Sequence, residues 1–97
     1  MPLFPGGKKA LAKYLRRTVR YPQEARAEGI GGRVYVRFLV DKDGNITQPV
    51  VIRKVSKACD QEAVRVVQNM PKWQPAEDKG YIVPAYAHVV INFQVLD

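Results

Sequence analysis

The stretch RVYVRFLV, residues 33 to 40, alternates between apolar and mixed positions and runs directly into DKDGN, residues 41 to 45. Such a period of two is typical of a β-strand with one face against a core. The Asp-Gly pair in the second segment is the strongest short-range signal for a hairpin turn. We therefore predict an antiparallel hairpin whose returning strand is ITQPVVIRKV, residues 46 to 55.

The returning strand is expected to keep Ile46, Val50 and Ile52 on the apolar face. Its Pro49 has no backbone N–H to donate to a neighbouring strand. This strand should therefore lie at an edge of the sheet or carry a bulge. The preceding turn, Asp41 to Asn45, faintly resembles a calcium loop, but its twelfth position would be Ile52 and not glutamate, so we interpret it as a hairpin.

A helix is predicted before the hairpin, in KKALAKYLRRTVRYP, residues 8 to 22. Its apolar residues recur at intervals of three and four, and basic residues occupy the opposite face. The apolar stripe consists of Leu11, Tyr14, Leu15, Thr18 and Val19. Gly7 is the expected N-cap, and Pro22 either stops this helix or begins a second short one, QEARAEG. The basic face is interpreted as solvated, with phosphate binding as the alternative.

A second long helix is predicted in SKACDQEAVRVVQNM, residues 56 to 70. Its apolar stripe consists of Cys59, Ala63, Val66, Val67 and Met70. Asp60 and Glu62 are placed in its first turn, where the helix dipole favours acids. Cys59 is interpreted as a small core residue, with a reactive thiol as the alternative.

A long third strand is predicted in VPAYAHVVINFQV, residues 83 to 95, after a turn-rich stretch through Gly80. Its apolar face consists of Val83, Ala85, Ala87, Val89, Ile91, Phe93 and Val95. Between the helix and this strand, Trp73 stands between Pro71 and Pro75. We expect the indole to fold back over one end of a small core; stacking on a ligand is the alternative.

These elements predict an α+β fold with the order helix, strand, strand, helix, strand. The simplest packing gives a three-stranded antiparallel or mixed sheet in the order 2-1-3, with both helices on one face. The length of 97 residues indicates a single domain over 1–97, in which residues 1–7 form an irregular lead-in.

Composition narrows the function. The net charge of +7 suits an anionic partner. No apolar run approaches the ~20 residues that span a bilayer, so we expect a soluble protein or an excised soluble domain. His88 is the only histidine and Cys59 the only cysteine, and no nucleophile with its base, acid–base pair or metal site can be assembled. We expect no enzyme, no metal and no cofactor.

Several short motifs occur in a distinctive order. They are Tyr21-Pro22, Ala25, Gly29, Gly32, Gly44, Asp60-x-x-Ala63, Met70-Pro71-x-Trp73-x-Pro75, Gly80-x-x-Val83 and Ile91-x-Phe93, with the alternating strand at 34–40. From about Phe4 to Val95 this arrangement resembles the C-terminal domain of TonB proteins. Two departures are Cys59, where that family more often has leucine, and Pro49, which interrupts the second strand.

The resemblance implies a periplasmic domain of a protein anchored in the inner membrane. It implies binding of the TonB box, a peptide of outer-membrane TonB-dependent transporters, while an inner-membrane proton-driven motor complex supplies the energy. The alternative is the same domain as a sensory or scaffolding appendage of another envelope protein, such as a membrane sensor peptidase. A basic nucleic-acid-binding domain is more distant; no nucleic acid is expected. We expect a monomer or a strand-swapped homodimer.

The third strand is the expected docking site, because an unpaired strand edge offers backbone N–H and C=O groups to an extended peptide. The predicted peptide-binding residues are Pro84, Ala85, Tyr86, Ala87, His88, Val89, Val90, Ile91 and Asn92. Of these, Tyr86, His88, Val90 and Asn92 alternate with the apolar positions and are expected to touch peptide side chains. Separately, Arg33 and Arg37 lie on the mixed face of the first strand and would extend the basic patch of the first helix, which keeps nucleic-acid binding open as a minor alternative.

Overall fold

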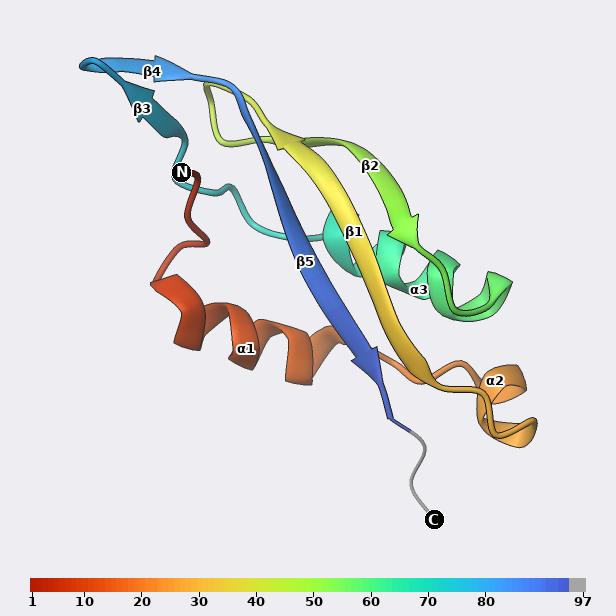
Figure 1. Cartoon of the computed structure of the whole chain (residues 1–97). Coiled ribbons are helices and arrows are strands. Elements are labelled where there is room, and N and C mark those ends of the chain that lie inside the picture. Colours follow the sequence, from red (N-terminus) through yellow and green to blue (C-terminus); the bar gives the residue numbers. More distant parts are fainter. Residues whose placement is uncertain (95–97) are drawn as a thin grey trace.

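The computed structural model describes residues 1–94, so Val95, the last position of the predicted third strand, lies outside the described residues. The elements are α1 (Gly7–Thr18), α2 (Gln23–Ala27), β1 (Gly32–Val40), β2 (Ile46–Arg53), α3 (Lys57–Gln68), β3 (Ala76–Asp78), β4 (Tyr81–Val83) and β5 (Ala85–Phe93). The long strands form an antiparallel sheet in the order β2-β1-β5, with α1 and α3 on one side of it (Figure 1). This confirms the predicted α+β fold and sheet order.

The core lies between this sheet and the two long helices. Its fully buried strand residues alternate along β1 and β5, and the apolar stripe of α3 covers them. The buried residues of these elements are Val34, Val36, Phe38, Val40, Cys59, Ala63, Val66, Val67, Val89, Ile91 and Phe93. The stripes predicted for β1 and α3 are therefore confirmed, and that of β5 is confirmed at Val89, Ile91 and Phe93, whereas Ala85 and Ala87 are only partly buried. The thiol of Cys59 is fully buried, as predicted. Helix α1 is half-buried against the same core through its own stripe.

The helix starts differ from expectation. The N-cap of α1 is Gly6, with φ +88°, and the helix is bounded from Gly7, whose φ is also positive at +84°. Helix α3 is capped by Ser56, whose hydroxyl accepts the Cys59 N–H at 3.1 Å. Asp60 lies in the first turn and accepts the Val55 N–H at 2.9 Å, but Glu62 lies one turn further on, so its predicted place was wrong. That position lets Glu62 reach the end of α1 instead.

Strand β2 carries the bulge that Pro49 suggested, and the bulge changes which residues face the core. The register against β1 shifts between Arg37 and Leu39, next to Gln48, which has φ +53°. Beyond the shift, Val51 packs on the core, while Val50 and Ile52 are 46% and 54% exposed. The predicted inward position of Val50 and Ile52 was therefore wrong, because one extra residue reverses the alternation of a strand.

A second, small hairpin stands where only turns were predicted. Strands β3 and β4 pair antiparallel at the end of the molecule away from α2 (Figure 1). Lys79 and Gly80 form the turn, both with positive φ (52° and 84°), the backbone form of tight hairpins. Pro84 then separates β4 from β5, so the third long strand begins at Ala85 and not at Val83.

Trp73 closes one end of the core. The indole is only 6% exposed and lies edge-on to Phe38 at 5.1 Å and to Phe4 at 5.8 Å between ring centroids. Its backbone N–H donates to the carbonyl of Gly44, in the β1–β2 turn, at 2.9 Å. The packing confirms the interpretation of Trp73 as a structural plug, because the ring faces its own core and not solvent.

Candidate functional site

Strand β5 is an edge strand with a long, regular free side. It pairs with β1 residue by residue, from Gly32 opposite Phe93 to Val40 opposite Ala85, without a bulge. Among the described residues no strand pairs with its other side. The opposite edge, β2, is less suited to a docked strand because two register shifts interrupt its pairing. The regular unpaired edge of the sheet is therefore β5.

The structure places the predicted peptide-binding residues as follows. The residues from Ala85 to Asn92 all lie on β5, whereas Pro84 lies in the junction before it. Tyr86, His88 and Asn92 are exposed and Val90 is half-buried, while Val89 and Ile91 are in the core. The strand thus has the predicted alternation, and Pro84 is not part of the edge because it interrupts the strand.

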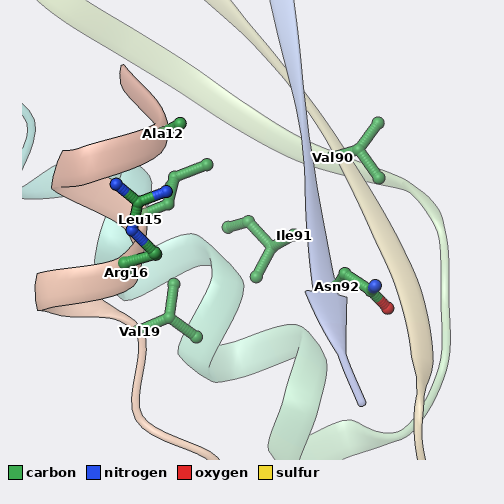
Figure 2. Close-up of a pocket in the computed structure, with 7 residues that line it drawn as sticks. All are labelled: Ala12, Leu15, Arg16, Val19, Val90, Ile91 and Asn92. Carbon is green, nitrogen blue, oxygen red and sulfur yellow. The ribbon is translucent and has the colours of Figure 1, made fainter. Parts of the chain in front are cut away.

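A hollow of about 330 Å³ lies beside the second half of β5. Figure 2 shows Ile91 pointing toward α1, with Val90 and Asn92 pointing to the other side. Successive side chains of a strand lie on opposite faces, so the lining by three consecutive residues, Val90 to Asn92, together with α1 fits a hollow that runs along the strand's edge. The hollow therefore opens on the free side of β5.

Helix α1 forms the second wall of this hollow, which the sequence did not predict. Its lining residues, labelled in Figure 2, are Ala12, Leu15, Arg16 and Val19. Leu15 and Val19 belong to the apolar stripe that the sequence shows, but the stripe alone does not say that part of it would border a strand edge. The wall is mainly apolar, and Arg16 adds a positive charge on its exposed side.

Two contacts hold α1 in place beside β5. The Tyr14 hydroxyl donates to the carbonyl of Val66 at 2.8 Å, and its burial raises the pKa of the phenol. At the end of the helix, the Arg65 guanidinium donates to the Thr18 carbonyl at 2.9 Å. Glu62 holds Arg65 through two hydrogen bonds of 2.7 and 2.8 Å and also accepts the Arg20 N–H at 2.7 Å. Helix α3 thus positions α1, the second wall of the hollow.

The hydrogen bond from Arg65 is the main reason that the pKa of Glu62 lies below its ordinary value. The Arg20 N–H acts in the same direction. Glu62 is therefore ionised at neutral pH, and its charge ties the chain after α1 to α3.

Residues 1–94 contain neither a membrane-spanning helix nor a cluster of metal ligands. No helix there is long and apolar enough to cross a membrane. Nor does that part of the chain bring together three or more histidine, cysteine, aspartate or glutamate side chains in a way that would hold a metal ion.

The sequence of residues 17–95 matches the family model described as Gram-negative bacterial TonB protein C-terminal. The chain belongs to the TonB C-terminal domain family. This confirms the resemblance on which the functional expectation was based. Most of α1, including Ala12, Leu15 and Arg16 of the groove wall, precedes the part of this TonB C-terminal domain that the family model matches.

Two known proteins are similar to this TonB C-terminal domain. Protein TonB of Pseudomonas aeruginosa is 38% identical over an alignment of 78 residues, which covers 77% of this chain and 22% of that protein. The chain therefore spans about a fifth of that relative's length. The solution NMR structure of the Helicobacter pylori TonB C-terminal domain superposes with a TM-score of 0.59, at 21% identity, over 89% of this chain and 90% of that one. The two chains share their fold.

Proposed function

We propose that this domain docks the TonB box of outer-membrane TonB-dependent transporters on the free edge of β5, by β-strand addition. In this proposal the domain works in the periplasm, as part of a protein anchored in the inner membrane. It passes the pull of a proton-driven motor complex to the transporter for nutrient uptake, and it catalyses no reaction itself. The observation that carries the docking site is the unbroken, unpaired edge of β5 beside a hollow.

In this proposal the free edge of β5 supplies the affinity for the peptide and carries the force along the strand. Each ladder hydrogen bond contributes about 0.5–1.5 kcal/mol net. Burial of one apolar peptide side chain contributes about 1.5–3 kcal/mol more. A handful of such bonds with one buried side chain corresponds to a Kd of roughly micromolar order. A force along the strand loads these bonds together, which suits a partner that must hold under tension and then release.

The hollow between α1 and β5 would receive side chains from one face of the docked strand. Side chains of a strand alternate between the two faces. Every second side chain of a strand on β5 would therefore point toward α1, where the partly buried Leu15 and Val19 offer apolar contacts. An apolar peptide residue at that level fits the hollow, and the residues on either side of it would lie beside His88, Val90 and Asn92.

A pair of proline variants tests the docking edge. Successive N–H groups of a strand point to opposite sides, so one of Val89 and Val90 donates toward β1 and the other toward the free side. Val89→Pro and Val90→Pro are compared for folding by circular dichroism and for affinity by titration with a synthetic TonB-box peptide. The proline on the free side should leave the domain folded and weaken binding tenfold or more. A folded variant with unchanged affinity would contradict the proposal.

A second measurement does not depend on how the proline variants fold. Replacing single backbone amides of the peptide by esters removes one donor at a time. Strand addition predicts that affinity falls at every second position, because only alternate amides of the peptide face β5. The titration is run at protein concentrations where sedimentation shows a monomer, since the same edge could pair with a second copy. Uniform losses, or none, would exclude strand addition.

A further inference from the structure

The sheet face that turns away from α1 and α3 carries positive charge only. The strands β1, β2 and β5 contain no aspartate or glutamate, and their three arginines, Arg33, Arg37 and Arg53, are all exposed. Arg37 lies opposite His88, and Arg53 lies opposite Tyr35, whose neighbour on β5 is Val90. Within residues 1–94 the single ion pair joins Arg65 to Glu62, so these three guanidinium groups have no carboxylate partner there.

Two of these guanidinium groups are held in place by aromatic rings. Arg37 lies 4.8 Å from the ring centroid of Tyr86, and Arg53 lies 5.4 Å from that of Tyr35. A guanidinium on a ring keeps its edge donors free while its side chain loses little further freedom on binding. Arg37 and Arg53 therefore form a preorganised pair of donors for planar anions such as carboxylates, and Arg33 adds a third exposed guanidinium on the same face.

We propose that this arginine face, defined by Arg33, Arg37 and Arg53 with Tyr35 and Tyr86, binds an acidic polypeptide segment. The occupant is the carboxylate-rich flank of the same polypeptide that docks on β5, so this inference rests on the proposed function. Tyr86 and His88 belong to both surfaces, since they lie on β5 and point to the arginine face. A polypeptide that continues beyond the docked strand on this face of the sheet would lie directly beside the arginines.

Features of the arginine face favour a polypeptide over a nucleic acid or a membrane surface. Bases bind open sheets by stacking on free aromatic faces, but a guanidinium already lies on each tyrosine ring. The half-exposed side chains of Val50 and Ile52 lie on β2, beside Arg53. An acidic peptide with some apolar residues matches this mixture, whereas a phosphate surface would leave the apolar groups without a partner.

The test uses hexaglutamate as the probe and two variants of equal charge. One variant is Arg33→Gln, Arg37→Gln and Arg53→Gln together. The matched control is Lys9→Gln, Lys13→Gln and Arg17→Gln, which removes three exposed positive charges from α1 on the other side of the sheet. The first variant loses three exposed arginine–carboxylate pairs, so it should bind hexaglutamate roughly tenfold more weakly. The control keeps these pairs, so its affinity should fall less than twofold. Equal losses in both would show general charge attraction and overturn the proposal.

Further experiments distinguish a failure of this proposal from a failure of the docking edge proposed on β5. A short TonB-box peptide without acidic residues should bind the arginine variant within twofold of the unmodified domain, and a hexaglutamate extension should tighten binding only where the arginines are present. An extension without effect would overturn the assigned occupant. If oligothymidylate or phosphatidylglycerol vesicles bind more tightly than hexaglutamate, and this binding depends on the arginines, the proposal that the occupant is a polypeptide is overturned. If the proline variants of β5 still bind the TonB-box peptide while the arginine effect persists, only the docking edge fails.

Discussion

At the scale of single residues, Gly44 shows how a turn and a loop from distant parts of the chain fix each other. Gly44 has φ +85°, and a Cβ there would lie 2.2 Å from the carbonyl oxygen of Trp73. Its own carbonyl accepts the Trp73 N–H. The sequence signals a turn at this glycine, but the reason that no side chain fits comes from the segment with Trp73, whose backbone contacts the turn.

Gly44→Ala should therefore cost more than the backbone strain alone. We expect a loss of about 2–4 kcal/mol in the free energy of unfolding, measured by urea denaturation. Gly80→Ala is the matched control, because Gly80 has nearly the same φ (+84°) and a Cβ there would meet no other atom within 4 Å. The control should lose only about 1–2 kcal/mol. Equal losses would mean that the contact with Trp73 does not matter.

Glu62 makes the stability of the domain depend on pH. Its pKa is lowered in the folded state, chiefly by the hydrogen bond from Arg65. A lowered carboxylate pKa adds stability above the unfolded value, and this stability is lost as the pH falls through the folded value. Glu62→Gln should therefore lower the free energy of unfolding by about 1 kcal/mol near neutral pH and by less in acid.

The comparison is made by urea denaturation at about pH 7 and about pH 3. Glu77→Gln, which changes an exposed carboxylate on β3, serves as the control and should have little effect at either pH. A difference between Glu62→Gln and the unmodified domain that stays the same at both pH values would show that the ionised carboxylate contributes nothing.

At the scale of elements, the strands and helices with a sustained period were predictable. Strand β1 and helix α3 bury the predicted stripe, and β5 follows one period but buries its stripe fully only from Val89 to Phe93. Strand β2 was predictable in extent but not in phase, since Pro49 signals a bulge without giving the residue at which the register shifts. The hairpin of β3 and β4 was missed because each strand is only three residues long, too short to show alternation.

The phase of β2 leads to a stability prediction for two adjacent valines. Val51→Ala removes methyl groups that pack on the core, and should cost about 1–2 kcal/mol. Val50→Ala makes the same chemical change on the arginine face, where the side chain is 46% exposed, and should cost less than about 0.5 kcal/mol. Thermal and urea unfolding of both variants measure the difference. A larger loss for Val50→Ala would restore the phase predicted from the sequence.

At the scale of the whole molecule, the two proposed binding surfaces, the docking edge and the arginine face, share β5. The position of the strand at an edge could be predicted, because the hairpin and the crossing helix leave it no other simple place in a three-stranded sheet. The groove could not, because it depends on where α1 lies relative to β5. That placement is set by contacts between distant residues, Tyr14 with Val66 and Arg65 with Thr18, which no local pattern reveals.

The measurement that tests the docking edge most directly is amide hydrogen exchange along β5, with and without a TonB-box peptide. In the free domain, alternate amides of Ala85–Phe93 face solvent on the unpaired side and should exchange fast. Bound peptide should slow that alternate set, most of all near the hollow at Val90–Asn92, and leave the amides that face β1 unchanged. Saturating peptide that leaves every β5 amide at its free rate, while it protects another part of the domain, would contradict the account.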